Sequence, residues 1–186
     1  TISLVQGDAL GGGFECALSS SFIVAEESSR MGFPEVLFNL FPGMGAYSFL
    51  VRKVGRRFTE EIINSGATYT ARQMLDMGVV DIVAADGMGE AAVATFIATH
   101  SRSSNGRRGI EAVAREIQPL KHDELVRVVD IWADAALRLG DRDMKLMDRL
   151  LRAQSRRHGP ADGSPKELAN VVRLNPSVAS NRAAAD

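Results

Sequence analysis

The sequence predicts an α/β protein, with short strands and helices in its first part and helices alone in its second. Compact apolar runs at residues 1–5, 22–25 and 79–83 are typical of strands. From Gly89 onward apolar residues recur at helical spacing instead. These observations indicate a layer of strands and helices followed by a helical cap.

Three regions follow from this pattern. We expect an α/β part at residues 1–88 and a helical part at residues 89–158. Residues 159–186 are polar and rich in Pro, Ser, Asn and Ala, so a disordered tail is predicted there. The first strand follows no leader sequence and would ordinarily pair with earlier strands, so we also expect that part of the fold precedes this chain.

Composition excludes several classes of protein. The 186 residues are 45% hydrophobic and 24% charged, with a net charge of −1, so no nucleic-acid partner or membrane surface is indicated. The single cysteine, Cys16, excludes an intrachain disulfide. No apolar run is long enough to cross a membrane and no signal peptide is visible, so we expect a cytoplasmic protein.

Glycine and proline residues punctuate the first part of the chain. Residues 7–10 predict a turn, and a helix begins at Phe14. Pro34 predicts a loop or short strand at residues 31–35 and argues against a helix there. Pro42 and the glycines after it predict a second turn.

Helices are expected after that second turn. The first continues through Val54 and ends at Gly55, and a short one covers residues 59–65. Another begins at the N-cap Thr70 and ends at Gly78. In the helical part, one face is expected to be apolar; it comprises Leu125, Val128, Val129, Trp132, Ala136 and Leu139.

The run Gly11-Gly12-Gly13 stands between a predicted strand and a predicted helix. Glycine allows close approach of a ligand to the backbone, and the first amides of a helix have no intrahelical partner. Such a turn is suited to negative charge. Neither phosphate-binding fingerprint fits, because Phe14-Glu15 follows the glycines and the spacing of a dinucleotide site is absent. A transient oxyanion beside the acid Glu15 is more compatible, and a tight packing turn with Glu15 at the helix N-terminus is the structural alternative.

A second acid, Glu35, directly follows Pro34 among apolar neighbours. Two carboxyl groups held near one substrate can take opposite roles, one as acid and one as base. The alternative is an exposed loop residue.

Several segments resemble the crotonase (enoyl-CoA hydratase/isomerase) superfamily. They are VQGDALGGGFE at residues 5–15, MGFPEV at 31–36 and FPGMG at 41–45, and residues 66–83 are similar to the family's helix leading to a Gly-Val-Val-Asp strand. The resemblance implies that residues 1–88 are the C-terminal part of a ββα spiral whose N-terminal half is missing. It implies an enzyme of the lyase type, Glu15 and Glu35 as the acid–base pair, and Gly12 as one oxyanion-hole amide, the second amide coming from an earlier segment.

Within the superfamily, the closer resemblance is to diffusible signal factor synthases. It rests on FNLFPGMGAYSF at residues 38–49, Ile131-Trp132, and MDRLLRAQSRR at 147–157. It implies dehydration of a 3-hydroxyacyl thioester on acyl carrier protein to a cis-2-enoyl product, then hydrolysis to a free fatty acid used in quorum sensing. Two alternatives stay open: a generic enoyl-CoA hydratase/isomerase, and an inactive fragment or interaction module.

Further residues are candidates for substrate and partner contacts. Gly11, Gly13 and Gly43 are taken as substrate-contacting residues. Trp132, the one tryptophan of the sequence, either lines an acyl pocket or packs in the core.

A basic stripe is expected on the last helix. Lys145, Arg149, Arg152 and Arg156 share one face in a stretch, 138–157, that holds seven basic and three acidic residues. The stripe either docks acyl carrier protein or CoA phosphates or is an ordinary solvated face.

The partners and cofactors expected are few. The histidines lack metal-ligand spacing, so no metal is predicted, and the substrate's own carrier, acyl carrier protein or CoA, takes the place of a cofactor. The family resemblance implies a homo-oligomer, a trimer or a hexamer.

Overall fold

The computed structural model describes the backbone of residues 1–101 and 104–157, and the predicted tail lies outside the described residues. Of Ser104 and of residues 154–157 only the backbone is described. The chain divides into two compact units, which meet between Leu146 and Met147. In the described residues, no helix combines the length and the apolar character needed to cross a membrane.

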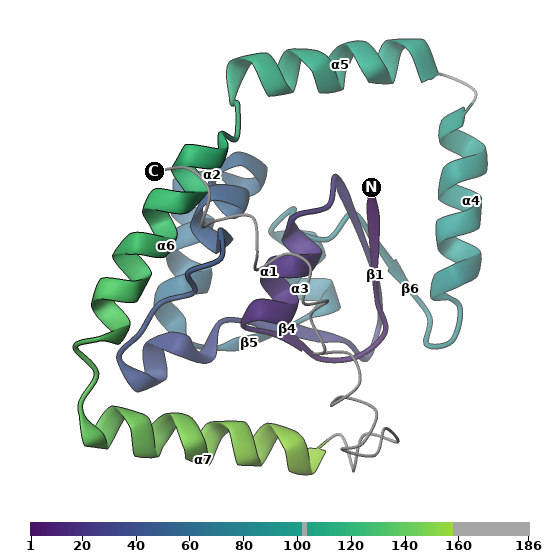
Figure 1. The fold of residues 1–186 in the computed structure, drawn as a ribbon. Helices are drawn as coiled ribbons and strands as arrows, with labels where there is room; N and C mark the ends of the chain where they lie inside the picture. The colour runs from purple at the N-terminus through teal and green to yellow at the C-terminus, as the bar shows by residue number, and fades with distance from the viewer. Residues whose placement is uncertain (102–103, 158–186) are drawn as a thin grey trace, which may run out of the picture. The chain divides into compact units, whose positions relative to one another are not determined.

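The first sheet is parallel and has the strand order β1-β3-β6, formed by β1 (Ile2–Val5), β3 (Phe22–Glu26) and β6 (Ile82–Ala84) (Figure 1). The predicted strands at 1–5 and 22–25 are confirmed to within one residue. The third strand begins later than predicted, because Val79 and Val80 are buried in the turn that follows the preceding helix. Successive residues of β3 are fully buried, as expected for a parallel strand covered on both faces.

The second sheet is small and lies next to the glycine run. It has the order β2-β4-β5, formed by β2 (Ala9–Leu10), β4 (Arg30–Gly32) and β5 (Thr68–Thr70). β2 is parallel to β4, whereas β4 and β5 are antiparallel. The turn predicted at residues 7–10 therefore ends in a two-residue strand, whose hydrogen-bonded neighbour β4 leads directly to Glu35.

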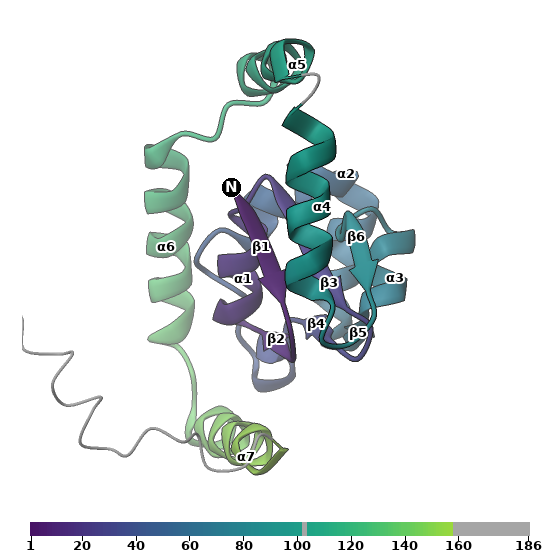
Figure 2. The ribbon, with the colours of Figure 1, turned by 90° about the vertical axis from the view of Figure 1, so that its right-hand side faces the viewer.

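Helices separate these strands and then follow them. α1 (Gly12–Leu18) connects the two sheets, α2 (Ala46–Ser65) and α3 (Ala71–Asp76) come before β6, and α4 (Gly89–Ser101) lies against β1, β3 and β6 (Figure 2). The last three helices are α5 (Ser104–Ile117), α6 (His122–Ala136) and α7 (Asp141–Arg157). This order, strands with helices first and helices alone afterwards, confirms the predicted mixed α/β class.

Two helix predictions need correction. Pro34 begins the 3₁₀ helix η1 (Pro34–Phe38), because proline is tolerated in the first turn, where its missing N–H has no intrahelical acceptor. Gly55 was expected to end a helix, and it does take a non-helical conformation with φ 74° and ψ 171°. The chain resumes its helix after this kink, so the two predicted helices are the two halves of α2.

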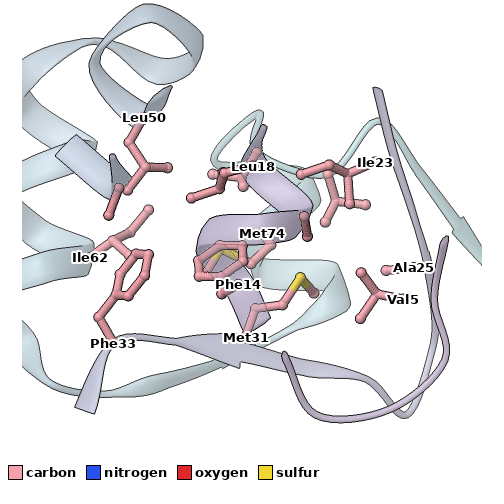
Figure 3. Close-up of a cluster of buried hydrophobic side chains, with 14 of the residues drawn as sticks. Val5, Phe14, Leu18, Ile23, Ala25, Met31, Phe33, Leu50, Ile62 and Met74 are labelled. Atoms are coloured by element: carbon pink, nitrogen blue, oxygen red, sulfur yellow. The ribbon is translucent and has the colours of Figure 1, made fainter. Parts of the chain in front are cut away.

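The hydrophobic core lies where α1, α2 and α3 meet both sheets (Figure 3). Phe14 of α1 and Phe33, between β4 and η1, are fully buried with ring centroids 4.9 Å apart. Leu50 and Ile62 of α2 and Met74 of α3 pack into the same cluster. Because Phe14 directly precedes Glu15 and Phe33 lies two residues before Glu35, core packing fixes the backbone that carries both candidate acids.

Candidate active site

Gly11 forms the turn that opens α1. Its φ of 55° lies in the left-handed region, and its N–H donates to the carbonyl of Gly32 at 3.0 Å. A Cβ at this position would lie 2.5 Å from Oε1 of Glu35. Glycine is therefore required here both for the backbone conformation and for the close approach of the Glu35 carboxyl.

Glu15 lies in the first turn of α1 and is only 3% exposed. Its Oε1 accepts hydrogen bonds from the backbone N–H of Met44 at 2.7 Å and of Ala46 at 3.0 Å. Burial raises the pKa of Glu15, and the two amide hydrogen bonds partly offset this rise. Since Ala46 is the first residue of α2, the carboxylate also caps that helix.

Glu35 lies on η1, with a half-buried side chain. Its Oε2 is buried and has no hydrogen-bond partner among the described residues. Burial, reinforced by the negative charge of Glu15, raises the pKa of Glu35 to about 7. The two acids are therefore near neighbours in different environments: the amides of Met44 and Ala46 hold Glu15, whereas one oxygen of Glu35 is buried without a hydrogen-bond partner among the described residues.

The other two glycines of the run differ from each other. Gly12 begins α1, so its N–H has no acceptor inside the helix, and a Cβ there would lie 2.7 Å from Cε of Met44. A Cβ on Gly13 would meet no atom within 4 Å. Gly12 thus offers an amide beside the two acids, whereas nothing in the described residues requires glycine at position 13.

Trp132 of α6 packs on the turn that precedes α2. A Cβ on Gly43 would overlap Cβ, Cγ and Cδ1 of Trp132, and one on Gly45 would lie 3.1 Å from Cδ2 of Leu125. Gly45 also has a left-handed φ of 113°. The sequence predicts Gly43 as a substrate contact and leaves Trp132 either lining an acyl pocket or packing in the core. The structure brings the two residues together beside the amides that hold Glu15.

The predicted apolar face of α6 is only partly buried. Leu125, Val128 and Trp132 are half-buried, but Val129 is 44% exposed. Val129 lies at the edge of the predicted apolar face, which explains why it is more exposed than its neighbours there.

The basic stripe lies along α7. Lys145, Arg149 and Arg152 follow each other at helical spacing, and Arg152 forms an ion pair with Asp148 at 2.8 Å. The side chain of Arg156 lies outside the described residues. The ion pair compensates part of the charge that the sequence assigned to this face.

An open apolar groove of about 480 Å³ lies between α4 and β6. It contains neither acid and none of the predicted site residues. Its lining residues are Ile82, Ala84, Ala85, Met88, Ala91, Ala92, Thr95, Phe96, Thr99 and His100. Within the described part of the chain, no three His, Cys, Asp or Glu side chains are placed to hold a metal ion.

Sequence reasoning missed the amides of Met44 and Ala46. They lie 29 and 31 residues from Glu15, and backbone donors carry no mark in the residue type. The only local signal is the pair of glycines around Met44, which predicts a turn but not its ligand.

Comparisons with known proteins identify the family of the chain. The model of the enoyl-CoA hydratase/isomerase family matches residues 1–116, more than half of the chain. Enoyl-CoA isomerase/hydratase fer4 of Mycosarcoma maydis is 41% identical over 85 residues, which are 45% of this chain and 31% of that protein.

Solved structures have the same fold. A putative enoyl-CoA hydratase from Streptomyces avermitilis has a TM-score of 0.69 at 22% identity, over 88% of this chain and 58% of that one. Carnitinyl-CoA hydratase from Mycobacterium avium has a TM-score of 0.64 at 26% identity, over 77% and 56% respectively. The chain thus spans less than two thirds of the length of these relatives. The family model, which matches more than half of the chain, shows that the chain belongs to the enoyl-CoA hydratase/isomerase family of the crotonase superfamily.

Proposed function

We propose that this chain carries the acid–base pair of an enzyme that adds water to, or removes it from, the C2–C3 bond of an acyl-CoA thioester. The observation that carries the proposal is the buried Oε2 of Glu35, which has no hydrogen-bond partner among the described residues, beside the amide-held carboxylate of Glu15. Two neighbouring acids in unequal environments are suited to opposite roles in one reaction.

The environments suggest which acid does which step. Two amide donors favour the ionised form of Glu15, whereas the absence of a donor at Glu35 Oε2 and the pKa of about 7 favour the neutral form. In hydration, Glu15 takes a proton from water as the water oxygen bonds to C3, and Glu35 gives its proton to C2. In dehydration the same two protons move in reverse.

Gly12 is proposed to stabilise the enolate. Its N–H begins α1 without an intrahelical acceptor and lies on the turn that Glu35 touches. A backbone donor aimed at a developing oxyanion typically contributes about 10²- to 10³-fold in rate. The same amide serves hydration and isomerisation, so it does not by itself select between them.

The reaction as proposed needs no metal and no bound cofactor, because the chain itself supplies the base, the acid and the oxyanion donor. Turnover in the presence of a chelator such as EDTA tests this point: the rate should be unchanged. A rate lost in EDTA and restored by a divalent cation would contradict it.

The experiment uses the full-length protein with crotonyl-CoA and with 3-hydroxybutyryl-CoA. Glu15→Gln and Glu35→Gln should each abolish the interconversion of the two substrates, which is measured by the absorbance of the enoyl thioester. Each should also abolish the exchange of the C2 proton with solvent deuterium. The exposed Glu27→Gln is the matched control, since Glu27 lies outside this site. Wild-type turnover in either site variant would contradict the acid–base assignment.

A second candidate is release of an unsaturated fatty acid, as in diffusible signal factor synthases. The specific support is the resemblance of residues 38–49, which begin at the last residue of η1 and include the turn that holds Glu15, and of residues 147–157 on α7. Acyl carrier protein would be the acidic partner of the basic stripe. Incubation with 3-hydroxyacyl thioesters on carrier protein and on CoA separates the candidates: free acid from the carrier-bound substrate favours this one, and an enoyl-CoA product without free acid favours the hydratase.

Self-association and a cytoplasmic location are also proposed. The support for self-association is the exposed apolar face of α5. The single cysteine supports a reducing compartment. Fractionation of cells that express the full-length protein is the corresponding test of location.

A further inference from the structure

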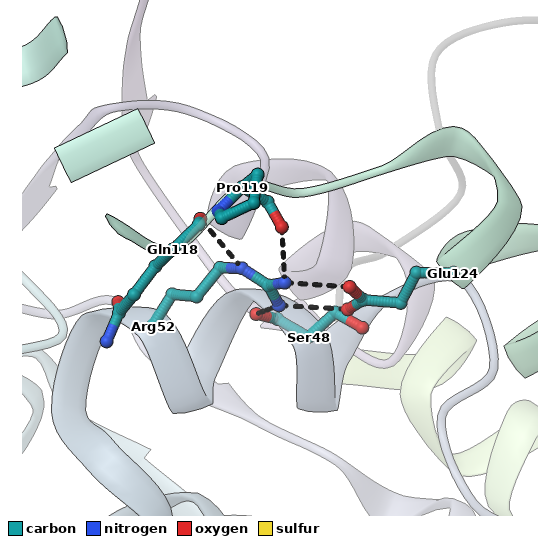
Figure 4. Close-up of polar contacts among 5 residues, drawn as sticks. All are labelled: Ser48, Arg52, Gln118, Pro119 and Glu124. Atoms are coloured by element: carbon teal, nitrogen blue, oxygen red, sulfur yellow. Dashed lines mark hydrogen bonds and ion pairs between the residues drawn. The ribbon is translucent and has the colours of Figure 1, made fainter. Parts of the chain in front are cut away.

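Arg52 of α2 uses every N–H of its guanidinium group (Figure 4). Nε donates to the carbonyl of Gln118 at 3.2 Å, Nη2 to that of Pro119 at 2.8 Å, and Nη1 to that of Ser48 at 2.9 Å. Nη1 and Nη2 also bind the two carboxylate oxygens of Glu124 at 2.9 and 2.7 Å. A guanidinium has five N–H groups in a rigid fork, so this site is fully occupied.

The fork joins three parts of the chain. Gln118 and Pro119 follow α5, Glu124 lies in the first turn of α6, and Arg52 lies on α2. The side chains of Arg52 and Glu124 are 24% and 30% exposed, so the pair is partly shielded from water. Bidentate, partly buried pairs are stronger than surface pairs, and the fork therefore fixes the start of α6 on α2.

The face of α6 that begins beside Glu124 covers the turn before α2. Leu125 is the next residue after Glu124 and contacts Gly45, and Trp132, two helical turns later, covers Gly43. Residues seven apart lie on one helix face, so a single placement of α6 sets both contacts.

Met44 lies between the two contacted glycines in the sequence, and Ala46 follows the second of them. Their N–H groups are the two donors to Glu15 Oε1. A shift of α6 would release the glycine turn, because Trp132 approaches Gly43 so closely that no Cβ fits there, and Cδ2 of Leu125 would lie 3.1 Å from a Cβ on Gly45.

We infer that Arg52 is a positioning residue for the acid–base pair: by fixing α6 over residues 43–45, it holds in place the two amides that bind Glu15. The effect on catalysis rests on the proposed function, whereas the effect on the turn does not.

The chain offers a matched control on the same helix. Arg56 forms an ion pair with Glu60 at 2.7 Å, but its side chain is 78% exposed and both residues belong to α2. Such a pair connects no second element, and exposed pairs of this type contribute little. Arg56→Gln removes the same charge as Arg52→Gln without touching α6.

The first experiment measures the turn directly in the full-length protein. In Arg52→Gln, hydrogen exchange in peptides covering residues 43–47 should accelerate at least tenfold, and the emission of Trp132 should shift to longer wavelength. Arg56→Gln should change neither. If Arg52→Gln does not fold, Glu124→Gln, which keeps the guanidinium and its carbonyl contacts, takes its place. Exchange and emission equal to those of the wild type in a folded variant overturn the inference.

The second experiment tests the consequence for Glu15. Loss of positioning should lower kcat on the order of tenfold to a hundredfold with little change in KM, because the acid pair is displaced while the substrate still binds. Arg52→Lys keeps the charge without the fork and should restore only part of kcat. A fall in melting temperature with kcat intact would reduce Arg52 to a purely structural role and overturn the catalytic part. If the wild type itself shows no turnover, the proposed function fails, but hydrogen exchange and emission still decide whether Arg52 holds the turn.

Discussion

At the residue scale, Glu35 has a carboxyl oxygen that is buried without a hydrogen-bond partner among the described residues. A buried carboxyl oxygen without a hydrogen-bond donor is costly to ionise, and the charge of Glu15 nearby adds to the cost. The fold could relieve the cost with an amide donor, as it does for Glu15. For Glu35, the hydrogen bond from its own backbone lowers the pKa less than burial raises it, so a proton stays available near neutral pH, as a catalytic acid requires.

Glu35→Gln should stabilise the protein at high pH while abolishing turnover. The folded-state pKa of about 7 lies above the ordinary value of 4.5, so the stabilising effect of the protonated form is complete below 4.5 and is lost as the pH rises to about 7. The full difference corresponds to at most about 3 kcal/mol. We expect Glu35→Gln to exceed the wild type at pH 8 by roughly 1–3 kcal/mol in the free energy of unfolding.

Urea denaturation at pH 5 and pH 8 checks this expectation. The wild type should lose stability between the two values more steeply than the variant does. Some slope should remain in the variant, because the pKa of Glu15 is raised as well. Identical pH slopes for the two proteins would contradict the assignment of a raised pKa to Glu35.

Gly11→Ala should damage both stability and turnover. Its φ of 55° is strained for alanine, and the new Cβ would displace the Glu35 carboxyl. A strained left-handed residue costs about 1–3 kcal/mol. Gly13→Ala is the control for stability, because its Cβ meets open space and alanine is favoured over glycine inside a helix by about 0.5–1 kcal/mol. A thermal unfolding temperature that falls equally in both variants would argue against this account of Gly11.

At the scale of single elements, the N-termini of α2 and α3 are capped in two different ways. α2 begins at a turn whose donors are satisfied by Glu15 of another helix, so the cap of α2 is also a candidate catalytic group. α3 is capped by its own residues instead: Thr70 Oγ1 accepts from the Gln73 N–H, and Gln73 Oε1 accepts from the Thr70 N–H. Only the second kind of cap is visible in the sequence, because its partners are three residues apart.

Thr70→Ala should therefore lower the free energy of unfolding by about 1 kcal/mol, the usual cost of losing an N-cap. α3 buries Ala71 and Met74 completely, so its first turn is part of the cooperative core. Thr68→Ala on the same strand is the control, since Thr68 is exposed and caps nothing. Chemical denaturation measures both, and equal losses would show that the capping box is not responsible.

At the scale of the whole molecule, the helical part exposes apolar surface that the first part does not cover. Ile110, Val113 and Ile117 of α5 are 72%, 56% and 71% exposed and share one face of the helix. Exposed apolar side chains that gather on one helix face are typical of surfaces that bind another protein. This face is what supports the proposed self-association.

Ile110→Asp or Ile117→Asp should therefore shift the full-length protein toward smaller assemblies in sedimentation velocity. Ala112→Asp adds the same charge on the opposite face of α5 and should leave the distribution unchanged. A wild type that is monomeric at micromolar concentration, or variants that sediment like the wild type, would refute self-association through α5.

Much of the fold was open to prediction because its signals are local. The strands β1 and β3, the break at Gly55 and the N-cap at Thr70 each follow from residues within a few positions of one another. The prediction at Pro34 was wrong because a local signal allows two outcomes. Proline is excluded from the interior of a helix but is tolerated at the first helical position. The α/β class and the family resemblance came from such ordered local patterns.

By itself, the sequence determined which residues could do chemistry here: Glu15, Glu35 and a glycine turn between strand and helix. Only the tertiary structure decided their environments. The donors of Glu15 come from about 30 residues away, and the fork of Arg52 reaches Glu124, 72 residues along the chain. Which carboxyl receives donors from far along the chain and which keeps a buried oxygen without one depends on contacts between distant backbone atoms, and residue types do not encode these contacts until the core has packed.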